Sequence, residues 1–417
     1  MKRDVVKLCL FFLLFSIAVP KLGTSPAAYA AGDSVFEHFV TMQGDKLMEG
    51  TEEFRFISTN MPDVLQIITN KQFESDSRIR LPNEYELRDA VATVKQMNGR
   101  VMRTFVVTVT NGDDPNYMVR ASVNEIAFNE EAMLVLDKLL QICNEMGVRV
   151  YIPLANYNDG IRGGTTTYGE NFFTVGSSAN QKFKQMVEQL LNRTNRYTGI
   201  PYKEDKAILG WESGNEIVIN DLPERSEWRQ DLAGFVKQIA PNQLFIDGRN
   251  KPDDVYKFSG GNMVQNYNEF LDDENIDILS YHTYVGLTGP VTDNSLPAGL
   301  RNNTSGDIGA TSTLKIIREL TKGKKPLVVG EIAMYMAPST LVTFLDELIA
   351  NGTSGANWWA TRFHNRDGGF YKHSDNGSQH EDLNWPGFPG TVGYVPEIEA
   401  EISIQNTLRE KAWKIMG

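Results

Sequence analysis

Eight short, mostly apolar segments alternate with longer segments of helical periodicity, and this alternation most limits the folds open to the chain. The expected strands lie at Phe54–Asn60, Val101–Val107, Val148–Leu154, Ile208–Ser213, Leu244–Asp247, Ile278–His282, Pro326–Gly330 and Ala356–Ala360. Several of them are continuous apolar runs, which is typical of strands buried on both faces of a parallel sheet. The sequence therefore predicts an α/β fold.

Helical periodicity fills most of the intervals between these strands. The expected helices are Glu84–Met97, Asn129–Met146, Ala179–Asn195, Ser226–Ile239, Thr311–Thr321, Pro338–Ala350 and Ile398–Met416. The segment Asp253–Phe270 is too polar and glycine-rich to predict a helix after the fifth strand. Eight strands with intervening helices favour a closed (β/α)8 TIM barrel. An open doubly wound sheet is the alternative, but the G-x-G-x-x-G sequence that normally accompanies it does not follow the first strand.

The first thirty residues have the pattern of a secretory signal peptide. A basic start precedes the apolar run Leu8–Val19, and Ala28-Tyr29-Ala30 supplies the small residues of a cleavage site. Twelve apolar residues are too few to span a bilayer. We expect a secreted, extracellular protein whose residues 31–417 form a single catalytic domain, with no membrane partner after cleavage and a monomeric state. Removal of Cys9 would leave Cys143 without an internal disulfide partner.

Composition and motifs exclude several function classes. The chain has 41 Lys and Arg against 53 Asp and Glu, a net charge of −12, which disfavours a nucleic-acid partner. It contains no G-x-S-x-G, no G-x-x-x-x-G-K-[ST], no C-x-x-C, no H-E-x-x-H and no EF-hand loop. We therefore expect no cofactor-binding residues and no metal site.

Two carboxylates stand where catalytic groups of a barrel are expected, at the carboxyl ends of strands. Glu216 follows the fourth strand and Glu331 ends the seventh. One carboxyl group kept protonated and one kept ionised can divide the work of glycoside cleavage, the first donating a proton and the second attacking the anomeric carbon. A single such Glu is more often a structural ion pair, but two at complementary strand ends favour catalysis. Retaining geometry places the two carboxyl groups about 5–5.5 Å apart.

Polar residues near the strand ends are candidate supports for this pair. Arg103 is a charge inside the apolar second strand, where burial without a carboxylate partner is costly, and we expect it to reach Glu331. Asn215 could hydrogen-bond a sugar hydroxyl, although a turn role is the simpler reading. His282 and Tyr284 lie two residues apart and would project to the same side of a strand.

Aromatic residues near the eighth strand are candidates for sugar contacts. Trp358 and Trp359 are adjacent, so one is expected to point inward as a floor for a pyranose ring and the other into the core. The loop Arg362–Pro389 is rich in polar and aromatic residues, and it contributes His364 as a candidate substrate contact. Three of the five histidines lie in this loop, but their spacing fits no zinc pattern.

Taken together, these motifs resemble the retaining (β/α)8 glycoside hydrolases of clan A. The resemblance rests on Asn215-Glu216, His282-x-Tyr284, Gly330-Glu331 and a Trp in the eighth strand. Within that clan the chain is most similar to family 5, in particular to its β-mannanase-like members, alongside which cellulases are also found. Phe39–Asn60 and Leu154–Tyr168, which includes Asn156, resemble the corresponding family segments.

The resemblance implies a role for each matching residue. Glu216 would be the acid/base and Glu331 the nucleophile, while Asn215 would bind the 2-hydroxyl group. The nucleophile would be supported by Arg103, His282 and Tyr284. Asn156 would contribute to substrate binding, and Trp358 or Trp359 would floor the subsite beside the scissile bond. Two departures stand out: Ile217 replaces the usual Pro, and Asn158 replaces a frequent Trp.

The sequence thus predicts a glycoside hydrolase that cleaves β-1,4-mannan or manno-oligosaccharides by double displacement. A polysaccharide or oligosaccharide is the expected partner. One alternative is the same machinery acting on another β-glycan such as a β-1,4-glucan, or acting from chain ends as an exo-β-mannosidase. An alternative of another class is a non-catalytic sugar-binding barrel.

Overall fold

The fold was examined in a computed structural model of the chain. It describes residues 34–68, 79–122, 125–157, 162–218, 223–250, 255–259, 262–266, 268–283, 306–332, 338–370, 383–385 and 398–417. The expected signal peptide, Tyr284 and Asn158 lie outside these residues. Within the described residues, none of the helices combines the length and apolar character that crossing a membrane requires.

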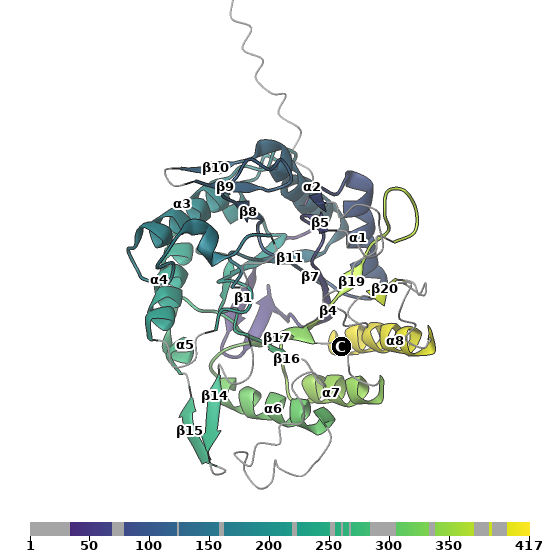
Figure 1. Ribbon diagram of the computed structural model, residues 1–417. Helices are drawn as coiled ribbons and strands as arrows, with labels where there is room; N and C mark the ends of the chain where they lie inside the picture. Colours follow the sequence, from purple (N-terminus) through teal and green to yellow (C-terminus); the bar gives the residue numbers. More distant parts are fainter. Residues whose placement is uncertain are drawn as a thin grey trace, which may run out of the picture.

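An eight-stranded parallel sheet forms the centre of the molecule (Figure 1). Its strands in chain order are β4 (Phe56–Met61), β7 (Val101–Thr104), β11 (Arg149–Pro153), β12 (Ile208–Glu212), β13 (Leu244–Ile246), β16 (Leu279–Thr283), β17 (Leu327–Ile332) and β18 (Gly355–Trp358). The two edges meet through a parallel bridge between Ile246 and Ile278. The predicted strands and the predicted TIM barrel are therefore confirmed.

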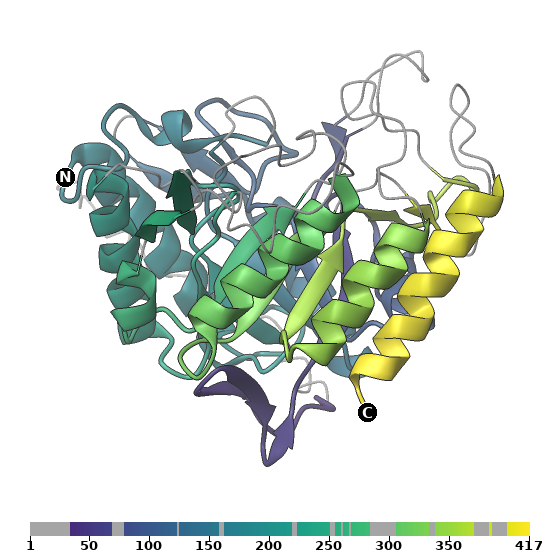
Figure 2. The ribbon, with the colours of Figure 1, turned by 90° about the horizontal axis from the view of Figure 1, so that it is seen from below.

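Helices surround the strands, as expected for this fold (Figures 1 and 2). They are α1 (Glu84–Gln96), α2 (Glu130–Met146), α3 (Ser178–Asn192), α4 (Pro223–Ile239), α6 (Gly306–Thr321), α7 (Pro338–Ala350) and α8 (Ile398–Ile415). Local signals explain two of the boundaries. Asn83 and Glu86 form a capping box at the start of α1, and Gly147, with a φ of 72°, ends α2.

Two apolar layers hold the barrel together. The larger lies between the strands and the helices, and the smaller lies inside the barrel. The hairpin of β1 (Val40–Gln43) and β2 (Lys46–Glu49), which continues into β3 (Glu52–Glu53), supplies Val40 and Leu47 to the inner layer. It projects from one end of the barrel (Figure 2), and its apolar side chains close that end.

Short elements between the barrel strands were not predicted. The segment after β7 forms a small sheet of β8 (Val109–Thr110), β9 (Val119–Ala121) and β10 (Ile126–Phe128). After β13 the chain forms the hairpin β14 (Tyr256–Ser259) and β15 (Asn262–Asn266), followed by the one-turn helix α5 (Glu269–Asp272). The remaining two-stranded pairs are β5 (Ile67–Ile68) with β6 (Ile79–Arg80), and β19 (Thr361–Arg362) with β20 (Leu383–Asn384). Strands of two to five residues are too short to produce a clear periodicity.

Candidate active site

The parallel register brings polar side chains from distant segments to one end of the barrel. His282 of β16 pairs with Glu331 of β17, next to an irregularity in the ladder. A bridge between Asn156 and Asn215 continues the pairing of β11 and β12 beyond their ends. The carboxyl ends of the third, fourth, sixth and seventh barrel strands therefore converge on one site, as the fold requires.

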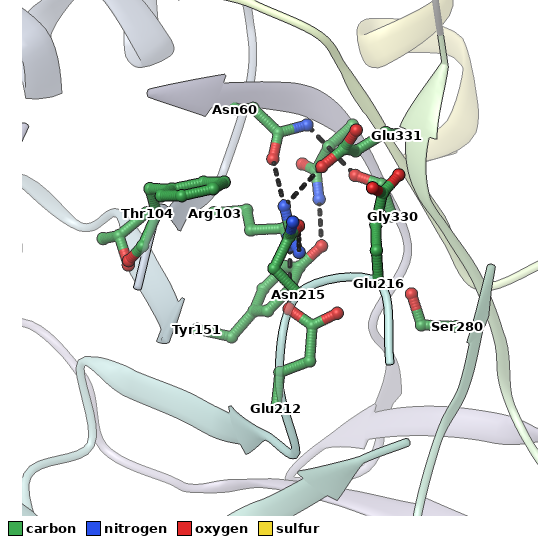
Figure 3. Close-up of polar contacts among 12 residues, drawn as sticks. Asn60, Arg103, Thr104, Tyr151, Glu212, Asn215, Glu216, Ser280, Gly330 and Glu331 are labelled. Atoms are coloured by element: carbon green, nitrogen blue, oxygen red, sulfur yellow. Dashed lines mark hydrogen bonds and ion pairs between the residues drawn. The ribbon is translucent and has the colours of Figure 1, made fainter. Parts of the chain in front are cut away.

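Arg103 of β7 is the centre of this site and is fully buried. Its Nε donates to Oε2 of Glu212 at 2.8 Å, and Nη1 donates to Oε1 of Glu331 at 2.8 Å. Nη1 also donates to Asn60 Oδ1 at 3.1 Å, and Nη2 donates to Asn215 Oδ1 at 2.9 Å (Figure 3). Ion pairing with the two carboxylates outweighs burial and raises the pKa of Arg103, so this guanidinium stays charged.

Glu216 lies at a backbone turn with a positive φ of 57°, an uncommon conformation for a side chain of this size. The side chain of Glu216 is 19% exposed, whereas that of Glu331 is only 2% exposed. Burial raises the pKa of Glu216, with Arg103 opposing the shift. A raised pKa favours the protonated form that an acid catalyst needs.

His282 contacts both carboxylates through one nitrogen atom. Its Nδ1 lies 3.0 Å from Oε1 of Glu216 and 3.3 Å from Oε2 of Glu331. Burial lowers the pKa of His282 to about 4, which keeps the ring neutral at physiological pH. The imidazole therefore bridges the pair without adding a second positive charge.

The two carboxylates are close enough to act on one bond. One ligand atom each from Glu216, His282 and Glu331 lie within 4.8 Å of one another, so the nearest oxygen atoms of the two carboxylates are no more than 4.8 Å apart. These three groups could also hold a divalent cation. Arg103 already places a positive charge against Glu331, and Coulomb repulsion from it would weaken the binding of such a cation.

Asn60 and Glu212 belong to the same cluster but were missed in the sequence analysis. Asn60 donates from Nδ2 to the carbonyl groups of Gly330 and Trp358 at 3.0 and 3.1 Å, tying β4 to the strands on its other side. Glu212 is fully buried at the end of β12. A charge within an apolar strand is the signal that singled out Arg103, and it could have identified Glu212 as well.

The adjacent tryptophans differ in how far they are buried. Trp358 is fully buried in the apolar layer between the strands and the helices. Trp359 is only partly buried and packs edge-to-face against Phe105, with ring centroids 6.0 Å apart. Trp359 is therefore the one with surface left for a ligand.

The other predicted site residues differ in how far the structure brings them to the carboxylates. Asn156 is buried, and its Oδ1 accepts a 3.3 Å hydrogen bond from Asn215 Nδ2, which places it beside the site. His364 is not brought to the pair by its contacts. Its ring Nδ1 lies 2.8 Å from Oδ2 of Asp89 on α1, and the ring packs against Phe370.

Comparisons with known proteins agree with this architecture. The family model described as glycoside hydrolase family 5 β-mannosidase-like matches residues 150–341, a segment that includes both Glu216 and Glu331. The mannan endo-1,4-β-mannosidase 2 of Oryza sativa subsp. japonica is 29% identical over 137 residues, which cover 29% of this chain and 31% of that protein. The mannan endo-1,4-β-mannosidase 1 of Arabidopsis thaliana is 26% identical over 176 residues, covering 38% and 43%. The chain thus spans less than half the length of these relatives.

The fold is shared over a larger part of the chain. The crystal structure of the endo-1,4-β-mannanase from Rhizomucor miehei superposes with a TM-score of 0.66 at 15% identity, covering 90% of this chain and 99% of that one. These matches confirm the barrel fold and the resemblance to the mannanase-like members of glycoside hydrolase family 5.

Proposed function

We propose, from the resemblance to family 5 mannanases and from the site geometry, that this chain is a retaining β-glycoside hydrolase of β-1,4-mannan or manno-oligosaccharides. The observation that carries the proposal is the pairing of Glu216 and Glu331 across one histidine nitrogen, at 3.0 and 3.3 Å. The two groups differ in environment, which suits them to different roles. Glu331 is held by the Arg103 cation, and Glu216 is held by the neutral His282 ring.

In the first step, Oε of Glu331 attacks the anomeric carbon while Glu216 gives its proton to the leaving glycosidic oxygen. The carbon–oxygen bond to the leaving sugar breaks, and a glycosyl ester to Glu331 forms. In the second step, ionised Glu216 takes a proton from water, and the water oxygen displaces Glu331 at the same carbon. Both carboxyl groups then regain their starting protonation states, so no cofactor is consumed.

The surrounding residues fit supporting roles in this scheme. Arg103 stabilises the carboxylate form of Glu331 that must attack. Asn215 is fixed by Arg103 through its Oδ1, and its Nδ2 contacts Asn156, which is consistent with an amide held ready for the 2-hydroxyl group. Trp359 offers a ring surface for the sugar at the eighth strand. Secretion is a further part of the proposal and rests on the N-terminal thirty residues alone.

Two Glu-to-Gln variants, each of which removes a carboxyl group, test the proposed roles. Glu216→Gln and Glu331→Gln should each lose at least about 1,000-fold of the turnover of an activated aryl β-mannoside. Glu86→Gln is a matched control because Glu86 is also a buried, ion-paired glutamate but lies on α1. Near-normal turnover in either site variant would refute the role given to that residue.

The substrate is tested separately by analysing products from mannan, β-1,4-glucan and manno-oligosaccharides. Internal cleavage of mannan supports the proposal, and release of single mannose units would indicate the exo mode. If only the β-1,4-glucan is cleaved, the substrate is that glucan and not mannan. Binding of mannan without any turnover by the wild-type chain would indicate a non-catalytic sugar-binding barrel.

A further inference from the structure

Glu212 stands in an unusual position for an acidic residue: it is fully buried, and one of its oxygens has no visible donor. Its Oε2 accepts from Arg103 Nε at 2.8 Å. Among the residues that the structure describes, none donates to Oε1. A buried carboxylate is costly unless it is paired, so a barrel that needed only packing here would be better served by an apolar side chain.

The Arg103 guanidinium is shared between two carboxylates. Glu212 and Glu331 bind different edges of the same planar group, and the labelled side chains lie on either side of it in Figure 3. With Nε fixed by Glu212, the two Nη atoms are directed to Glu331 and Asn215. A guanidinium held at three points loses the freedom to rotate away from any one of them.

We propose that Glu212 is a positioning residue for the reaction, which orients Arg103 toward Glu331 and Asn215 and offsets part of the positive charge that Glu331 experiences. The inference rests on the proposed function, because it concerns how Glu331 is prepared to attack. Glu212 itself does not touch the reacting atoms. It acts through the Arg103 guanidinium, which contacts it directly.

The charged and titratable groups around Glu212 make its charge matter. Arg103 of β7, Tyr151 of β11 and His282 of β16 interact electrostatically with Glu212 itself. Glu331 of β17 and Glu216 beyond β12 complete the set because they interact with the same Arg103. Asp247, which follows β13, is paired with Arg249 at 2.7 Å and with Arg229 at 3.5 Å, so its charge is balanced separately. Arg103 is the only cation in the first set, because burial keeps His282 neutral at physiological pH.

If Glu212 lost its charge, the positive charge of Arg103 would no longer be partly neutralised, and Glu331 and Glu216 would experience it in full. The ionised form of each would be favoured, and the pKa of each would fall. Both limbs of the pH–activity profile should then move to lower pH by about one unit, the size expected for one charge at several ångströms in a partly buried site. A less basic Glu331 is also a weaker nucleophile, so kcat should fall by up to about tenfold, the most that a one-unit fall in the pKa of the nucleophile can cause.

Two substitutions separate the charge of Glu212 from its shape. Glu212→Gln keeps the length of the side chain and loses the charge, whereas Glu212→Asp keeps the charge and shortens the reach to Nε. We expect Glu212→Gln to shift both limbs to lower pH. We expect Glu212→Asp to lower kcat while leaving both limbs within about 0.3 pH units of the wild type. The measurements are kcat and kcat/KM on an aryl β-mannoside from pH 3.5 to 8.5.

Glu86→Gln is the matched control here as well, because it removes a buried ion-paired glutamate away from the site. It should lower thermal stability without moving either limb of the pH–activity profile.

An unshifted pH–activity profile and a kcat within about twofold of wild type for Glu212→Gln would overturn the proposal. Limbs shifted equally in Glu212→Gln and Glu212→Asp would overturn it as well. If Glu212→Gln does not fold, loss of kcat in Glu212→Asp with unshifted limbs supports the proposal, and unchanged kcat overturns it. Absence of turnover in the wild-type chain would instead overturn the proposed function.

Discussion

Nη1 of Arg103 lies 2.8 Å from Oε1 of Glu331, and both side chains are shielded from solvent. The same guanidinium reaches Asn215 through Nη2 at 2.9 Å. One buried cation on β7 therefore fixes both the proposed nucleophile and the amide proposed to bind the 2-hydroxyl group.

Replacing Arg103 by Lys should lower kcat/KM on an aryl β-mannoside by roughly 100-fold or more. A lysine keeps the positive charge but lacks the planar fork, so it cannot contact Glu212, Glu331 and Asn215 at once. Circular dichroism should verify that the variant is folded. Activity within about threefold of wild type would show that charge alone suffices and would contradict the positioning role.

His282 should make the protein less stable as the pH falls from about 6.5 to about 4. Its pKa is near 6.5 when unfolded and is lowered to about 4 by burial, so the unfolded state binds the extra proton first in this window. The stability present above pH 6.5 should decline by on the order of 3 kcal/mol on reaching pH 4. Urea unfolding at several pH values would measure the decline.

The variant His282→Gln isolates that contribution. It has no titrating ring, so its free energy of unfolding should fall less steeply between pH 6.5 and 4 than that of the wild type. Parallel curves for the two proteins would show that the pKa of His282 is not lowered by folding.

Glu86 should contribute stability in a lower pH window. Its partners are Arg80 and Arg366, at 2.6 and 2.7 Å, and its carboxylate also accepts from the Asn83 backbone. These contacts outweigh burial and lower the pKa of Glu86 to about 2. The stabilisation is present above pH 4.5 and is lost as the pH falls toward 2.

Glu86→Gln should therefore lower the free energy of unfolding at pH 7 by about 2 kcal/mol. The difference from wild type should narrow between pH 4.5 and 3, because in this range the unfolded wild-type chain binds a proton at Glu86 while the folded chain does not. If the difference in free energy of unfolding stays constant from pH 4.5 to 3, the stabilisation comes from the shape of the Glu86 side chain and not from its charge.

The neighbouring tryptophans should respond differently to truncation. Trp358→Ala removes a fully buried indole and should cost about 3–5 kcal/mol of stability. Trp359→Ala should cost much less stability but raise KM for manno-oligosaccharides several-fold, since the partly exposed ring at Phe105 is the one available for stacking. Thermal denaturation and steady-state kinetics on both variants would test this, and a KM unchanged in Trp359→Ala would contradict a stacking role.

The barrel could be predicted from the sequence because its strands are short, mostly apolar segments and most of the intervals between them have helical periodicity. Gly147 and the capping box at Asn83 show that helix ends are encoded locally as well. Glu216, Glu331 and Arg103 could be singled out because each is an ionisable residue within or just after a buried strand.

Which side chains contact one another across the barrel could not be predicted in the same way. That Arg103 also binds Glu212, 109 positions later in the chain, depends on barrel geometry and leaves no mark in local periodicity. The contact between His364 and Asp89 of α1 is another example, because 275 positions separate the two residues in the chain. The small sheet β8–β10 and the hairpin β14–β15 are too short to produce a pattern.

The stereochemistry of the first product formed tests the pairing of Glu216 with Glu331 most directly. Proton NMR of a manno-oligosaccharide digest, recorded before mutarotation, distinguishes the two anomers of the newly formed reducing end. Attack by Glu331 followed by water inverts the anomeric carbon twice, so the β-anomer should appear first. Initial release of the α-anomer would mean a single displacement by water and would contradict the role of Glu331 as nucleophile.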